Sequence, residues 1–146
     1  MNSTYQFSEQ RLKNKRQQFH VQMHHLGIMH SKSSLLASYD ASSTLELSEE
    51  DLDELIYRLK KMDLARYEPT PLMREWRSNV LSMINKLGIY VNNNDWKNVN
   101  TFMLDKRIAG KLMYELTVPE LKVLHRKLMS IARKQSQKPK IEYSLN

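Results

Sequence analysis

The sequence predicts an all-α protein of about six helices, arranged as two repeated three-helix halves that pack into a compact helical body. Apolar residues recur at three-, four- and seven-residue steps in successive segments, which is typical of amphipathic helices. Glycine and proline interrupt these segments at points where helices end or begin. The same signals return in the same order in both halves. The length of 146 residues suits one ordinary domain or two very small ones.

Three helices are expected in the first half. The first spans about 8–26, and Gly27 follows it where a left-handed residue often ends a helix. A shorter helix is expected over 31–41, before a small polar turn. Ser48 and Asp51 resemble a capping box with a shorter acid, and the acidic first turn of the third helix suits the helix dipole.

The second half repeats this plan after a proline-containing segment at 68–71, which interrupts helical structure. A fourth helix, with Trp76 on its apolar stripe, is expected to end at Gly88, and a fifth to end near Gly110. The sequence Thr117-Val118-Pro119-Glu120 predicts the start of the sixth helix, with a capping threonine, an early proline and a glutamate at the third helical position.

Two sets of matching residues support the repeat. Leu26-Gly27-Ile28 matches Leu87-Gly88-Ile89 at an offset of 61, and Leu47-Ser48 matches Leu116-Thr117 at an offset of 69. A unit of this size buries its own apolar faces poorly, so we expect the halves to pack into one compact helical body or into two touching lobes. The predicted divisions are a first repeat over 1–66, a linker over 67–72, a second repeat over 73–135 and a flexible tail over 136–146.

Composition excludes several functional classes. The absence of cysteine removes disulfide frameworks, cysteine zinc sites and cysteine nucleophiles. With three glycines, the chain contains neither common phosphate-binding glycine motif. No apolar run is long enough for a membrane span or a secretory signal, so we expect a cytoplasmic protein without membrane partners.

Positive charge is concentrated in the second half of the chain. The formal net charge is +7, but residues 1–70 hold 9 basic and 10 acidic side chains, whereas residues 71–146 hold 14 and 6. On a helical wheel, Lys122, Arg126 and Arg133 of the last helix lie almost opposite its apolar stripe, and Lys127 and Lys134 form a flanking stripe. This pattern predicts a ridge that contacts phosphates, although a solvated helix face with protein partners alone gives the same pattern. The candidate nucleic-acid-binding residues are Lys106, Arg107, Lys111, Lys122, Arg126, Lys127, Arg133 and Lys134.

Two other groups could carry chemistry. His20 and His24 lie one helical turn apart and could share a divalent metal, but no third ligand or catalytic glutamate accompanies them. The carboxylates around Glu49–Glu54 are explained by helix capping, and no pocket is indicated that would raise one of their pKa values. We therefore predict no catalytic residues, no metal and no cofactor.

Two segments of the chain resemble a known family. The first contains Lys15-Arg16, Leu26-Gly27-Ile28 and the run Leu47–Leu55. The second contains Met73-Arg74 and Leu87-Gly88, followed by Phe102, Arg107, Gly110 and Leu116-Thr117. In these motifs, which span roughly residues 11–132, the chain resembles the GemA-like regulatory proteins of phage Mu and related prophages. The resemblance implies a small protein of a phage or mobile element, linked to host gene expression and DNA topology, with no catalytic residues to carry over.

The expected function is therefore regulation by binding. We expect a non-enzymatic phage or prophage protein whose basic C-terminal half binds DNA or an acidic surface of a host DNA-handling protein. A protein-protein adaptor without nucleic-acid contact is the alternative, and a histidine-metal-dependent enzyme is a weaker one. The sequence leaves the oligomeric state open, and no small-molecule substrate is expected.

Overall fold

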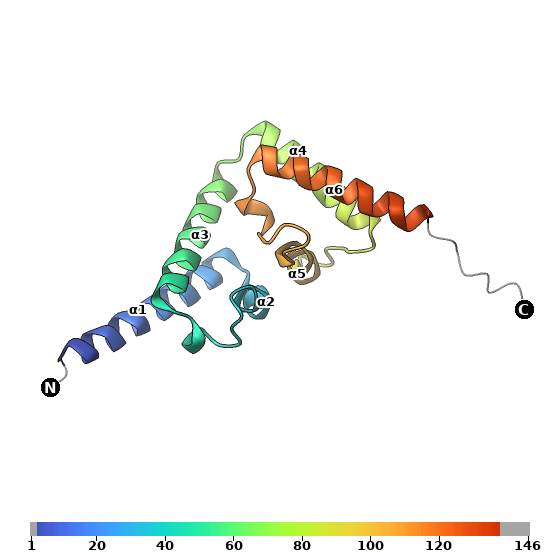
Figure 1. The fold of residues 1–146 in the computed structure, drawn as a ribbon. Helices are drawn as coiled ribbons and strands as arrows, with labels where there is room; N and C mark the ends of the chain where they lie inside the picture. Colours follow the sequence, from blue (N-terminus) through green and yellow to red (C-terminus); the bar gives the residue numbers. More distant parts are fainter. Residues whose placement is uncertain (1–2, 138–146) are drawn as a thin grey trace, which may run out of the picture.

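The computed structural model describes residues 3–137 and shows an all-α fold (Figure 1). Within that range there are six α-helices and no β-strand, apart from one isolated bridge between Asn92 and Asp95. Short 3₁₀ turns precede α2, α3 and α6. The helices are α1 (Ser3–Leu26), α2 (Lys32–Ala37), α3 (Glu49–Tyr67), α4 (Pro71–Lys86), α5 (Lys97–Leu104) and α6 (Val118–Gln137), and the 3₁₀ turns are η1 (Met29–Ser31), η2 (Thr44–Glu46) and η3 (Met113–Glu115).

The long helices form two parallel pairs. In the first half, α1 lies beside α3, and in the second half α4 lies beside α6 (Figure 1). Arg11 pairs with Glu49 near the start of α3, whereas His25 pairs with Asp63 near its end. Because the contacting residue numbers rise together, α1 and α3 run in the same direction. The short helices α2 and α5 contact each other between the two pairs.

Several predicted helix boundaries are confirmed. Gly27 and Gly88 have φ angles of 70° and 90°, in the left-handed region that ends a helix at low cost for glycine. The Ser48 side chain accepts a hydrogen bond from the backbone N–H of Asp51 at 3.1 Å, and so caps α3. At the start of α6, Thr117 and Glu120 bond reciprocally through side chain and backbone, which completes the predicted capping box.

Other boundaries differ from prediction. Ser8 lies inside α1, which begins at Ser3 because no glycine or proline interrupts residues 3–8. Helix α2 ends at Ala37, and the chain turns through Asp40, whose φ angle is 57°. Since Thr70 caps α4 and Pro71 occupies its first turn, the connection from α3 is shorter than the predicted linker. Of the predicted tail, residues 136–137 are helical and the remainder lies outside the described residues.

Two apolar clusters form the interior, and the boundary between them does not follow the predicted repeats. The first cluster joins α1, α2 and α3, but it also includes Leu104 and Leu112 from the second half. The second cluster joins α4, α5 and α6. The two halves therefore share buried surface. The order of elements is similar in the two halves, but the proposal that they are repeats of one three-helix unit stays a prediction.

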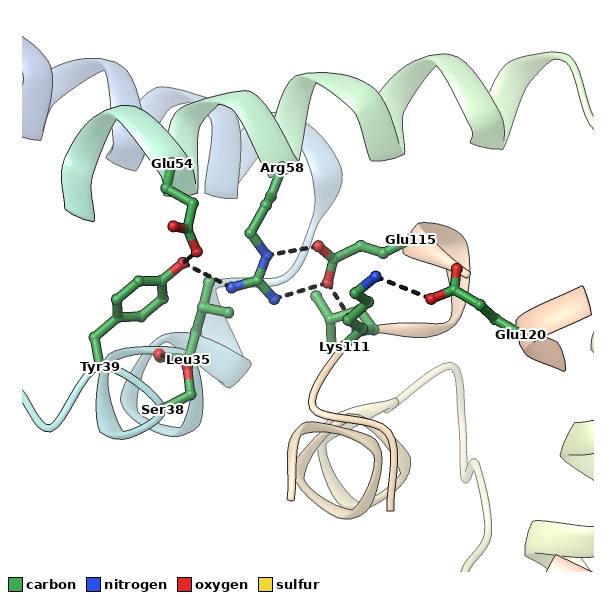
Figure 2. Close-up of polar contacts among 9 residues, drawn as sticks. Leu35, Ser38, Tyr39, Glu54, Arg58, Lys111, Glu115 and Glu120 are labelled. Carbon is green, nitrogen blue, oxygen red and sulfur yellow. Dashed lines mark hydrogen bonds and ion pairs between the residues drawn. The ribbon is translucent and has the colours of Figure 1, made fainter. Parts of the chain in front are cut away.

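An ion pair with little solvent exposure joins the halves (Figure 2). The Arg58 guanidinium on α3 donates two hydrogen bonds to the Glu115 carboxylate on η3, at 2.6 and 2.9 Å. The exposed fractions of the two side chains are only 18% and 8%. A third donor of Arg58 reaches the Tyr39 hydroxyl, which itself donates to Glu54. Arg58 therefore fixes α3 to the segment that leads into α6.

Glu115 satisfies more than one partner. Its carboxylate also accepts the backbone N–H of Leu112 at 2.8 Å and so shapes the turn before α6. Burial disfavours the charged form of Arg58, but the bonds to Glu115 outweigh it and raise the pKa of the guanidinium. Arg58 consequently stays charged at any ordinary pH, and removal of Glu115 would leave that charge uncompensated in a poorly solvated place.

A change of Glu115→Ala should therefore strongly destabilise the protein. It leaves the Arg58 charge uncompensated, and the expected loss in free energy of unfolding is about 3–5 kcal/mol, measured by urea denaturation. Lys111→Met is the matched control because it breaks the exposed Lys111–Glu120 pair nearby. That change should cost less than about 1 kcal/mol. Equal losses in the two variants would show that the Arg58–Glu115 pair does not join the halves.

Candidate nucleic-acid interface

Helix α6 is anchored along one side and exposed along the other. Leu121, Leu124 and Leu128 are buried in the second apolar cluster, and Ile131 is partly buried against it. This confirms the predicted apolar stripe. The solvent-facing surface of α6 carries five exposed basic residues, of which Lys122, Arg126 and Arg133 lie opposite the apolar stripe and Lys127 and Lys134 flank it.

These cations have few acidic partners. Within residues 3–137, none of Arg126, Arg133 and Lys134 forms an ion pair. The last acidic residue of α6 is Glu120, in its first turn, and it is paired with Lys111. The solvent face beyond the first turn of α6 therefore has an uncompensated positive charge.

Lys122 and Lys127 are held by neighbouring elements on opposite sides of α6. The Lys122 ammonium lies 5.6 Å from the centre of the Trp76 ring on α4, a cation–π distance. The Trp76 ring packs edge-on against His125. Lys127 donates to the backbone carbonyls of Arg107 and Ile108 at 3.0 and 2.9 Å. It therefore draws the loop after α5 towards α6.

The three remaining candidates lie in that loop, and two of them, Arg107 and Lys111, are paired with carboxylates. Lys106 is exposed. The Arg107 guanidinium pairs with Asp105 at 2.9 Å and lowers the pKa of that carboxyl to about 2. Lys111 pairs with Glu120 at 3.0 Å, beside the start of α6 (Figure 2). The loop thus adds less free positive charge to the surface than α6 does.

The first half neutralises its acidic helix internally. Arg11 and Lys15 on α1 both pair with Glu49 at 2.6 Å, and Lys15 also reaches Asp53 at 2.8 Å. The hydrogen bond from Arg11, followed by that from Lys15, lowers the pKa of Glu49 to about 2. Sequence reasoning explained these acids by helix capping and missed the pairing. The available signal was the four-residue spacing shared by the basic pair on α1 and the acidic pair on α3.

The corresponding contact in the second half has a different chemistry. At the offsets of 61 and 69, Lys15 corresponds to Trp76 and Asp53 corresponds to Lys122. An ion pair between α1 and α3 thus occupies the place of a cation–π contact between α4 and α6. A carboxylate neutralises a lysine, whereas an indole ring only positions it. The charge of Lys122 therefore remains available on the surface.

The histidines do not gather into a metal site in the described residues. His20 packs edge-on against Phe19, and partial burial lowers its pKa. His24 is exposed on the same helix. Within residues 3–137, no group of three or more histidine and acidic side chains is arranged to hold a metal ion.

A cleft between the halves was not predicted. It has a volume of about 340 Å³ and receives side chains from α1, α3, α5 and η3. Asn100 lies in its wall and donates to the Ser31 hydroxyl at 3.1 Å, so this buried amide helps to join the halves. His30 lines the same cleft. Sequence spacing gave no signal for it, because its walls come together only when the halves pack.

Comparisons with known proteins leave the relationships of the chain open. No family model, no curated protein and no solved structure matches it. Among the described helices, none combines the length and apolar character that crossing a bilayer requires.

The pairing of Glu49 predicts a pH dependence of stability. The pKa of this carboxyl falls from an ordinary 4.5 to about 2 on folding, so the folded state binds fewer protons than the unfolded state in this interval. The contribution is complete above about pH 5 and is lost as the pH falls towards 2. In Glu49→Gln, the free energy of unfolding should change less steeply between pH 5 and 2 than in the unmodified protein. Parallel curves from urea titrations would contradict the pairing.

Proposed function

We propose that this protein is a non-enzymatic regulator that binds duplex DNA through the exposed basic face of α6. The observation that carries this proposal is the set of unpaired cations Arg126, Arg133 and Lys134 on a helix whose opposite side is buried. Cations on a rigid helix can contact phosphates at low conformational cost, and such binding weakens steeply with salt. The resemblance to GemA-like proteins supports a phage or prophage role in host gene expression or DNA topology.

The distribution of charge supports a single binding face. Residues 1–70 hold 9 basic and 10 acidic side chains, so the first half adds little net charge. Two of the acidic residues of α3, Glu49 and Asp53, are also paired with cations of α1. The basic residues of α6 are exposed, whereas its apolar residues are buried in the second cluster. An approaching polyanion is therefore attracted to the second half.

A protein partner is the second candidate, and it has an observation of its own. Tyr57 and Leu64 lie seven residues apart on α3, and 61% and 70% of their surfaces are exposed. This spacing places both on one helix face. An adaptor would use these side chains to contact a host protein, whereas DNA binding requires neither of them.

Charge reversal on α6 tests the proposal. The variant with Lys122→Glu, Arg126→Glu and Arg133→Glu should lose at least tenfold in affinity for a labelled duplex, measured by fluorescence anisotropy. The slope of log affinity against log salt should fall by about 3, because up to three phosphate contacts are removed. The matched control reverses three exposed lysines of the first half, Lys13, Lys60 and Lys61.

The control variant carries the same change in net charge. If both variants lose affinity equally, overall charge rather than the face of α6 governs binding. If neither binds less tightly than the unmodified protein, α6 is not the DNA site. Circular dichroism of each variant checks that the helices remain formed.

A further inference from the structure

The cations of α6 form two stripes with an uncharged strip between them. Taking 100° per residue and Lys122 as zero, Arg126 and Arg133 lie at about 40° and 20°. Lys127 and Lys134 lie at about 140° and 120°. Between these stripes, at about 60–100°, lie three uncharged residues. They are Val123, Ser130 and Gln137.

The uncharged strip is open to solvent. The exposed fraction of Val123 is 54%, and Ser130 and Gln137 are also exposed. Within residues 3–137, neither Ser130 nor Gln137 has a side-chain hydrogen bond to another residue. The polar groups of the strip are therefore free to bond an external partner.

The two stripes are supported from different sides. Lys122 rests on the Trp76 ring of α4, whereas Lys127 is tied to the loop carbonyls of Arg107 and Ile108. Their separation around the helix is thus fixed by packing on both flanks. An ammonium group has three donors, so Lys127 keeps one after bonding two carbonyls.

These dimensions match those of a DNA groove. A helix with its side chains is about 10–12 Å across, and the major groove of B-DNA is about 12 Å wide and bounded by two phosphate backbones. A helix lying in that groove presents its two flanks to the two backbones and its central strip to the base edges. The minor groove, about 6 Å wide, does not admit a helix.

We propose that α6 enters the DNA major groove, with its two basic stripes on opposite backbones and Val123 and Ser130 against the bases. This inference rests on the proposed DNA-binding function and assigns the residues that determine specificity. The valine methyl groups suit the thymine methyl, and the serine hydroxyl can bond the purine N7 acceptor or other base-edge groups. Seven residues of helix span about 10.5 Å, so the two side chains address bases about three steps apart.

The experiment compares two duplexes that have the same phosphates. The first is the best-binding sequence selected from a random duplex pool by the full chain. The second has the same sequence with 7-deazapurines for purines and uracil for thymine, which removes N7 acceptors and methyl groups from the major groove. Binding of both is measured for the unmodified protein, for the double variant Val123→Ala, Ser130→Ala, and for Ser82→Ala, an exposed control on α4.

The unmodified protein and the Ser82→Ala control should bind the second duplex at least about fivefold more weakly than the first. The double variant should bind both duplexes alike, with an unchanged salt slope, because its phosphate contacts remain. Equal binding of both duplexes by the unmodified protein would overturn major-groove entry and leave the DNA-binding proposal standing. A preference that survives in the double variant would overturn the assignment of Val123 and Ser130. Absence of salt-dependent binding to any duplex would instead refute the proposed function itself.

Discussion

The ion pair between Arg58 and Glu115 is the constraint on which the rest of the arrangement depends. It crosses from α3 to the turn before α6 in a place where both charges are largely removed from water. Glu115 also fixes the backbone of that turn through Leu112, whose side chain belongs to the first apolar cluster. The direction in which α6 leaves the junction is therefore tied to the position of α3. The orientation of the basic face of α6 relative to the first half therefore depends on the rigidity of this junction.

The two halves contain similar helix pairs whose charged side chains are arranged differently. Helices α1 and α3 pair cations with carboxylates, and this neutralises the first half from within. Helices α4 and α6 pack through apolar side chains and the Trp76–Lys122 contact, which leaves the charge of α6 facing outward. The α1–α3 pair is held together partly by ion pairs, whereas the α4–α6 pair leaves its cations exposed to solvent. The proposed function depends on this difference, since a polyanion needs cations that no internal carboxylate has already bound.

Local sequence signals predicted the helices well where a residue type dictates backbone geometry. Gly27 and Gly88 end helices because glycine adopts positive φ at little cost, and Ser48 and Thr117 begin them because their hydroxyls accept free N–H groups. Prediction was poorer at α2, where no such residue marks the end. It was also wrong at the end of α5, which stops at Leu104 rather than near Gly110. The buried stripe and the basic face of α6 could both be predicted from periodicity, since the helix is regular and one of its sides is apolar throughout.

The sequence by itself determined the all-α class, most helix boundaries and the concentration of charge in the second half. These follow from backbone preferences and from spacings within one helix, which act over a few residues. Only the tertiary structure decided which charges are free. Arg11 and Glu49 are 38 positions apart, and Arg58 and Glu115 are 57 apart. Whether such residues meet depends on how the helices pack, because neutralisation of a charge is a matter of distance in space and of exclusion of water.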